Sequence, residues 1–186
     1  MSGNVLVWIE HTDGTPLSAS WEALGLARQI ADASSRGVVA LVAGQGVDAL
    51  AQAAIHHGAD EVIKADDPTL AQVRFEPYVA LLAKVVAEQG PDVVLAAATT
   101  AGRELLAGAA AEADAGLLTD VVDLALEGTT LRGVRPVLGG KVLRIEVIEG
   151  EGPKFATLRA RAFPAPEPDT NRVGSISAVE PALAAD

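Results

Sequence analysis

Short runs of consecutive apolar residues recur along the first hundred positions of the chain. They are rich in valine and lie at Val5 to Ile9, Val38 to Ala43 and Val93 to Ala97, and the segment Glu61 to Ala65 is predicted as a further strand although it includes Glu61 and Lys64. Runs of this length and composition predict buried strands. A strand that is apolar at every position is typical of a parallel sheet covered on both faces.

The segments between these runs carry apolar residues at helical spacing. Helices are predicted from Ser18 or Ser20 to about Gly37, from about Val47 to Gly58, and from about Pro77 to Gln89. Strands that alternate with helices are joined by right-handed crossovers, which build a parallel sheet. We therefore predict an α/β fold, a doubly wound, mainly parallel, Rossmann-like sheet.

The spacing of the apolar runs changes after Gly116. Strand-like segments follow one another across short glycine-containing turns, and they are Thr119 to Leu126, Leu131 to Val134, Lys141 to Ile148 and Lys154 to Ala162. Such close spacing is typical of antiparallel strands. We expect antiparallel strands to be added at this C-terminal end, making the sheet mixed there.

The last part of the chain has no clear periodicity. Residues 164–186 are rich in Pro, Ser, Asp and Glu, which predicts a flexible linker or tail. The α/β domain is accordingly expected to occupy residues 1–163.

Composition narrows the classes of function. Aromatic residues are only 3% of a chain that is 49% hydrophobic, so the core is expected to consist of Ala, Val and Leu. No apolar run approaches the roughly 20 residues that span a bilayer, and no secretory leader is evident, which predicts a cytoplasmic protein without a membrane span. The net charge of −11 argues against a nucleic-acid partner. The absence of cysteine excludes disulfides, thiolate catalysis and cysteine-ligated metals.

One glycine motif matches a dinucleotide fingerprint. Residues 44–49, Gly-Gln-Gly-Val-Asp-Ala, satisfy G-x-G-x-x-G/A, and Asp66 and Asp67 follow about 20 residues later. The motif, however, follows the second predicted strand, whereas the fingerprint usually opens the first unit of the fold. We favour an ordinary tight turn.

The chain shows no convincing enzyme site. The adjacent His56 and His57 point about 100° apart on a helix and cannot both hold one metal, so no metal is expected. No nucleophile elbow is present. Asp120 and Asp123, if they lie in one strand, fall on opposite faces and cannot act as an acid/base pair. The chain is therefore predicted not to be an enzyme.

The stretch from Thr99 to Arg103 is the main candidate site. The predicted strand that ends at Ala97 is followed by Thr99, Thr100, Gly102 and Arg103 at the start of a helix. This arrangement brings together backbone N–H groups, two hydroxyls and a guanidinium, which together can hold an anion. Alternatively, a threonine caps the helix, Gly102 permits a close approach, and Arg103 pairs with Glu104 or a nearby loop. From local chemistry both interpretations remain open.

The same run, AATTAGRELLAGAAAEADAGLLTDVVDL, resembles the diagnostic segment of the electron transfer flavoprotein α subunit, the FixB family, in its N-terminal domain. The resemblance rests on the threonine-glycine-arginine turn and on Thr119, Asp120 and Val121. Further blocks agree in order, and they are NVLVWIEH, ALVAGQGVDALAQAAIHHGADEVIKADD, VRPVLGGKVLRIEV with Arg135, and KFATLRARAFPAP with Arg159. Thr99, Thr100, Gly102, Arg103 and Arg135 are the expected partner or anion contacts.

The resemblance implies electron transfer, with FAD held by a second domain that has no counterpart after Pro164. No flavin-binding residue can then be assigned to this chain. The chain would be a split protein, a degenerate paralogue or a truncated chain. Its expected partners are a β-like subunit, which could carry AMP, and a separate FAD-binding domain. The alternative is a stand-alone AMP- or ATP-binding protein that uses the C-terminal edge of the sheet, as adenine nucleotide alpha hydrolase-like proteins do.

Overall fold

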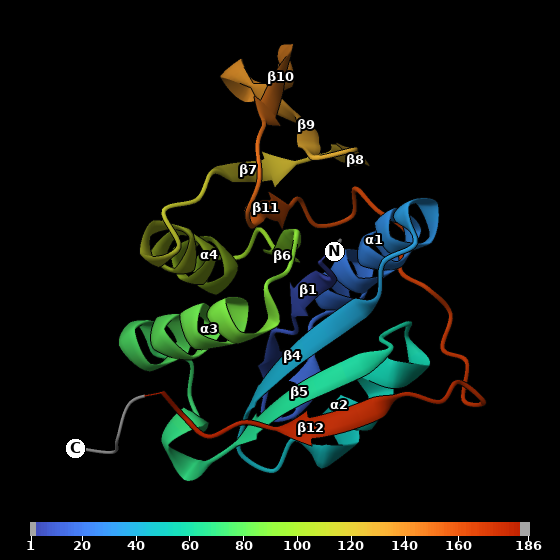
Figure 1. Ribbon diagram of the computed structural model, residues 1–186, viewed down its shortest axis with the longest axis vertical. Helices are drawn as coiled ribbons and strands as arrows, with labels where there is room; N and C mark the ends of the chain where they lie inside the picture. The colour runs from blue at the N-terminus through green and yellow to red at the C-terminus, as the bar shows by residue number, and fades with distance from the viewer. Residues whose placement is uncertain (1–2, 183–186) are drawn as a thin grey trace.

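The computed structural model describes residues 3–182, and its centre is a parallel sheet of seven strands (Figure 1). Every neighbouring pair of strands in this sheet is parallel. The doubly wound architecture predicted from the sequence is confirmed. In order across the sheet the strands are β12 (Ser175–Ala178), β5 (Glu61–Asp66), β4 (Val38–Gly44), β1 (Val5–Trp8), β6 (Val93–Ala97), β11 (Lys154–Leu158) and β7 (Leu117–Val121).

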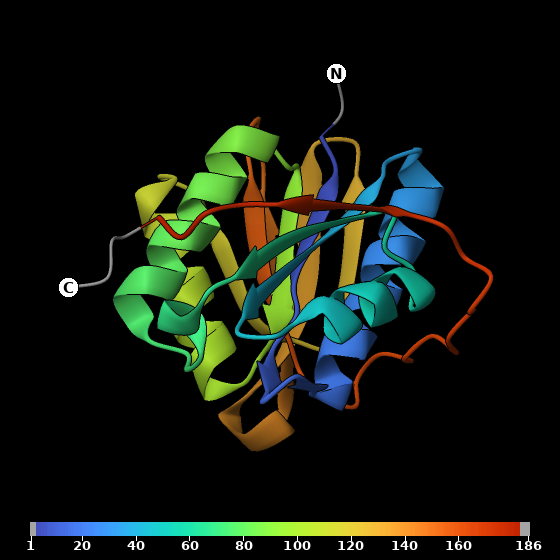
Figure 2. The same ribbon diagram turned by 90° about the horizontal axis from the view of Figure 1, so that it is seen from below.

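Helices cover both faces of this sheet. Two of them pack on one face and two on the other, as Figure 2 shows. Val5 and Val7 of β1 face the first pair, whereas Leu6 and Trp8 face the second, as the two-residue period of a strand requires. No helix in residues 3–182 is long and apolar enough to cross a membrane. The first pair is α1 (Ser18–Ser34) and α2 (Asp48–His56); the second is α3 (Phe75–Gln89), preceded by the short 3₁₀ helix η1 (Pro68–Leu70), and α4 (Thr100–Glu112).

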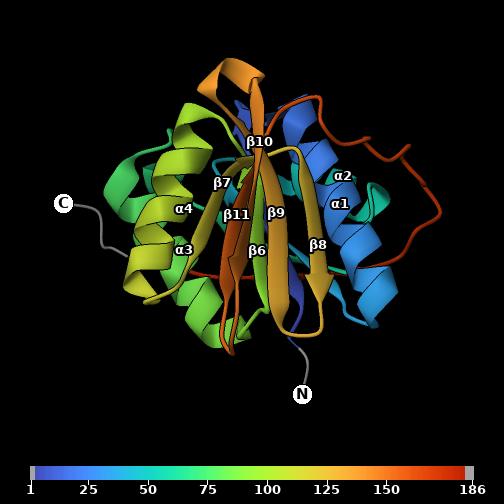
Figure 3. The same cartoon turned by 90° about the horizontal axis from the view of Figure 1, so that it is seen from above.

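A separate antiparallel sheet packs on the end of the central sheet that carries β11 and β7. Its inner face joins the same apolar cluster as α1 and α2, through Leu124 and Leu131. Figure 3 shows this small sheet between α1 and α4. It consists of β8 (Asp123–Glu127), β9 (Thr130–Val137) and β10 (Val142–Ile148), with a 3₁₀ turn, η2 (Leu138–Gly140), at the tip of the β9–β10 hairpin.

The expectation of one mixed sheet is wrong in two respects. Thr119 to Leu126 is not a single strand, because it is interrupted at Val122. The N–H of Val122 donates to the carbonyl of Val134, in the second sheet. The final predicted strand is parallel and lies between β6 and β7. Asp120, with a φ of +57°, bends the chain out of the central sheet, so the antiparallel strands form a layer of their own.

The segment after Pro164 departs from the expected flexible linker or tail. It runs back past α1 and α2 to the far edge of the central sheet (Figure 1). The N–H of Asp169 donates to the carbonyl of His56 over 2.8 Å, and Arg172 donates to Asp60 over 2.5 Å.

This segment ends in β12, which pairs in parallel with β5. All four side chains of β12 are exposed, so backbone hydrogen bonds to β5 hold the strand in place. A polar strand held by a distant partner leaves no periodic signal of its own, which explains the difference from the sequence-based expectation. Residues 183–186 of the predicted tail lie outside the described residues.

Candidate functional site at the carboxyl edge of the sheet

The carboxyl ends of the parallel strands lie at one edge of the sheet, where doubly wound proteins usually bind ligands. The topological switch point lies between β1 and β6, because the chain builds the sheet outward in opposite directions from these two strands. Glu10 follows β1 and Thr99 follows β6. The hydroxyl of Thr99 donates to Oε2 of Glu10 over 2.5 Å, so one hydrogen bond spans the switch point.

Thr99 also caps α4. Its Oγ1 accepts a hydrogen bond of 2.9 Å from the N–H of Gly102, and its backbone is extended, as a cap residue requires. Thr100 is the first residue of the helix and is exposed. Thr99 is therefore the capping threonine, and its hydroxyl serves as both donor and acceptor.

Gly102 allows α4 to begin directly against the end of β6. A Cβ atom at this position would lie 2.0 Å from the carbonyl oxygen of Ala97, a backbone atom that cannot move aside. Gly102 is thus needed for the close approach of α4 to the end of β6.

Arg103 folds back onto the loop that precedes its helix. Its Nε donates to the carbonyl of Ala98 over 2.9 Å, rather than pairing with Glu104. Arg103 is exposed, and no acceptor is found for its two terminal nitrogens within residues 3–182.

Asp120 and Arg159 form an ion pair at the same edge. Nε and Nη2 of Arg159 donate to the two carboxylate oxygens over 3.1 and 2.6 Å. These hydrogen bonds, together with the charges of Arg103 and Arg135, hold the pKa of Asp120 below its ordinary value, although burial acts to raise it. The sequence-based list of contact residues missed this pair, although both residues lie in the sequence blocks that carry the family resemblance. Asp123 lies on another strand, β8, and pairs with Arg132.

Arg135 reaches this edge from β9. Its Nη1 donates to the hydroxyl of Thr119 over 2.7 Å. Its Nε is buried and has no hydrogen-bond partner among the described residues. We refer to Arg103, Arg135 and Arg159, gathered around Asp120, as the arginine cluster.

The glycine-rich turn before α2 has no place for a pyrophosphate. The carboxylate of Asp66 accepts hydrogen bonds from the N–H groups of Gly46, over 2.7 Å, and Val47, over 3.1 Å. Gly44 is needed because a Cβ there would lie 2.7 Å from the ring of His11. The tight-turn interpretation of this motif agrees with this geometry.

The two adjacent histidines contribute to local packing. His56 accepts from the side chain of Gln52, while His57 donates to the carbonyl of Ala53 and stacks on Trp21 at 4.2 Å. The ring of His57 thereby links the end of α2 to α1, while the ring of His56 bonds within α2.

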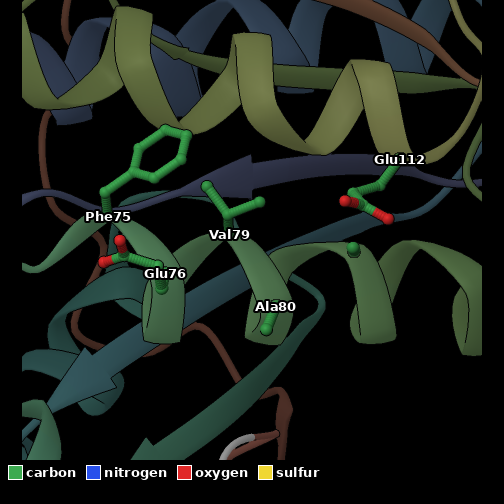
Figure 4. A pocket seen from close by; sticks show the side chains of 6 residues that line it. Phe75, Glu76, Val79, Ala80 and Glu112 are labelled. Carbon is green, nitrogen blue, oxygen red and sulfur yellow. The ribbon is translucent and has the colours of Figure 1, made fainter.

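Two apolar surfaces lie away from the carboxyl edge. One is a groove of about 370 Å³ between α3 and α4, shown in Figure 4. It is lined by Phe75, Glu76, Val79, Ala80, Ala83 and Glu112.

The other surface is the outer face of the small sheet. Leu143, Ile145 and Val147 of β10 are 63%, 59% and 53% exposed, and Val134 and Pro136 of β9 lie directly opposite the first two. We call these five residues the apolar face.

Sequence comparison assigns the chain to a known family. A family profile, "Electron transfer flavoprotein domain", matches residues 5–184. "Electron transfer flavoprotein subunit alpha" of Bacillus subtilis (strain 168) is 32% identical over 98% of this chain and 55% of its own length. "Protein FixB" of Azorhizobium caulinodans is 33% identical over 93% of this chain and 48% of its own. "Lactate dehydrogenase (NAD(+),ferredoxin) subunit LctC" of Acetobacterium woodii is 32% identical over 88% and 39%.

The structure defines a doubly wound α/β domain with an added antiparallel sheet and an arginine-lined carboxyl edge. The chain belongs to the electron transfer flavoprotein family, and two of the relatives named above are an α subunit of this family and a FixB protein. It spans about half the length of the curated relatives it matches.

Proposed function

We propose that this chain is the non-catalytic, partner-binding domain of an electron transfer flavoprotein of the α type. Family membership supports a role in electron transfer. Two of the relatives, the Bacillus subtilis α subunit and LctC, carry the word subunit in their names, which supports the expectation of a partner chain of the β type.

The observation that carries the proposal is the apolar face. Three large aliphatic side chains on one strand, all more than half exposed, are costly to leave in water and mark an interaction surface. β10 is also the edge of its sheet, so the backbone groups on its outer side have no strand partner among the described residues. The hairpin tip adds Leu138, which is 76% exposed and has a φ of +53°, an unusual conformation for a leucine.

FAD belongs, in this proposal, to another domain or another chain. The relatives extend well beyond the segment that they share with this chain, and their additional length has room for a cofactor domain. The carboxyl edge offers poor support for the alternative of a bound adenine nucleotide at the switch point. Glu10 places a negative charge there, and its hydrogen bond to Thr99 spans the crevice.

The experiment is co-expression of the chain with a β-type subunit of the family, followed by light scattering. The native chain is expected to form a stoichiometric complex and Ile145→Asp to form none, because a carboxylate cannot be buried there without a partner. Val173→Asp is the matched control, since Val173 is 89% exposed and lies two residues before β12, the strand at the opposite edge of the central sheet. Equal complex formation by the native chain and Ile145→Asp would contradict the proposed surface.

A second measurement addresses the cofactor. The chain purified alone is expected to lack the flavin absorption band at about 450 nm. A stoichiometric flavin on the isolated chain would assign the FAD to this domain instead.

A further inference from the structure

The arginine cluster holds more hydrogen-bond donors than its surroundings accept. In Arg103 only Nε has an acceptor, and in Arg135 only Nη1 has one, within residues 3–182. The buried Nε of Arg135 is one of the few such atoms left without a partner. A buried N–H group without an acceptor destabilises the folded protein, so the unpaired Nε of Arg135 needs an explanation.

The three arginines form one continuous site. Arg103 bonds to the carbonyl of Ala98, whose own N–H donates over 2.7 Å to the carbonyl of Leu158, the residue before Arg159. Arg135 bonds to Thr119, the residue before Asp120. Three elements far apart in sequence thus place their guanidinium groups around one carboxylate.

The charge of this site contrasts with that of the whole chain. Three guanidinium groups face one carboxylate, Asp120, in a protein whose net charge is −11. Of the other carboxylates nearby, Glu146 pairs with Arg144, whereas Glu10 accepts from the hydroxyl of Thr99, which carries no charge. Arg103 and Arg135 themselves form no ion pair within residues 3–182.

We propose that Arg103 and Arg135 bind a phosphate group at this edge, while Asp120 holds Arg159 beside it. A phosphate monoester carries about −1.5 to −2 charges at pH 7, which matches the two uncompensated guanidinium groups, whereas a carboxylate would leave one of them unmatched. Guanidinium groups donate to phosphate oxygens in pairs, and the start of α4 adds a partial positive charge on the same side.

The site lies beside the switch point rather than on it. It extends from the end of β6, where Arg103 bonds to Ala98, across the ends of β11 and β7, which lie on the side of β6 away from β1. This inference does not depend on the partner-binding role proposed above.

Isothermal titration calorimetry on the full chain, in a phosphate-free buffer of low ionic strength, tests the proposal. Inorganic phosphate and glycerol 3-phosphate are the two probes, and we expect saturable binding with a Kd of about 1 mM or tighter for one or both. Tighter binding of glycerol 3-phosphate would identify a monoester as the source of the group, and tighter binding of inorganic phosphate would identify the free ion.

Two variants distinguish the site from general charge attraction. Arg103→Gln is expected to weaken binding about tenfold to a hundredfold, because it removes charge-assisted hydrogen bonds. Arg132→Gln removes the same charge on β9, but three residues from Arg135 and hence on the other face of the strand, and should bind as the native chain does.

The proposal is overturned if neither probe binds saturably below about 10 mM, or if both variants weaken binding equally. Arg103 is exposed, so its substitution should leave the fold intact, and circular dichroism would verify this. Arg135→Gln is a third variant and should weaken binding as Arg103→Gln does. Arg135 is half-buried, so if this substitution prevents folding, Arg103→Gln alone decides the outcome.

Discussion

Arg159 and Asp120 meet through two hydrogen bonds, of 3.1 Å between Nε and Oδ1 and 2.6 Å between Nη2 and Oδ2. Arg159 follows β11 and Asp120 belongs to β7, so the pair joins the ends of neighbouring strands. Asp120 has a φ of +57°, which Asp and Asn tolerate better than most residues. The ion pair therefore fixes the bend at which the chain leaves the central sheet.

This pair predicts a dependence of stability on pH. Hydrogen bonds and charge from Arg159 lower the pKa of Asp120 below its model-compound value of 3.8, against the effect of burial. A carboxyl whose pKa is lowered by folding stabilises the protein above its unfolded pKa, and this contribution is lost as the pH falls through the folded pKa. Asp120→Asn is expected to cost about 1 kcal/mol at pH 7.

Urea denaturation of the native chain and of Asp120→Asn between pH 7 and pH 3 measures this effect. The difference between their free energies of unfolding should shrink as the pH falls below about 4. Asn keeps the preference for positive φ, so the backbone is not strained by the substitution. Asp60, whose pKa is also lowered, is common to both proteins and cancels in the difference. A difference that is independent of pH would contradict the role of the ion pair.

Gly102→Ala is expected to destabilise the domain by about 2 kcal/mol or more. The added methyl group would lie 2.0 Å from the carbonyl oxygen of Ala97, so helix α4 must shift away from β6. Gly108→Ala on the same helix is the control, because its methyl group would meet side-chain atoms of Val79, at 2.7 and 3.0 Å, and of Phe75, at 3.2 Å, which can shift toward the adjacent groove, rather than a backbone carbonyl. Helix propensity favours alanine at both positions. Thermal melts that show equal losses for the two variants would refute the close-approach argument.

The two neighbouring threonines should respond differently to substitution. Thr99→Ala removes the cap of α4 and the bond to Glu10 and should cost about 1–2 kcal/mol. Thr100→Ala should change stability by less than about 0.5 kcal/mol, since Thr100 is exposed and makes no cap. Chemical denaturation of the two single variants measures both values. The capping assignment fails if Thr100→Ala is the more damaging substitution.

Arg172→Ala should loosen the edge strand without unfolding the domain. Arg172 donates to Oδ1 of Asp60 and to the carbonyl of Ala59, and β12 beyond it has only exposed side chains. We expect faster hydrogen exchange in β12, with protection in β4 unchanged. Arg74→Ala is the control, because the hydrogen bond of Arg74 goes to the carbonyl of Thr69 and not to β5 or β12. Unchanged exchange in β12 would show that its backbone pairing suffices.

Much of the candidate site could be predicted from the sequence. A threonine cap and a close glycine at the start of a helix are local features, and Thr99 and Gly102 play these roles within three residues of each other. The partners of the site could not be predicted in the same way. Glu10 is 89 residues from Thr99, and Arg159 is 39 residues from Asp120. Charged residues at strand ends indicate a shared edge but not which side chains pair.

The sequence by itself determined the alternation of buried strands and amphipathic helices, because each of these elements repeats its apolar positions within its own length. It also determined the parallel core, since strands that are apolar throughout must be covered on both faces. Only the tertiary structure decided which sheet the later strands join, where β12 attaches, and how three arginines come to surround Asp120. These features depend on backbone hydrogen bonds and charges between distant segments, whose pairing leaves no local period in the sequence.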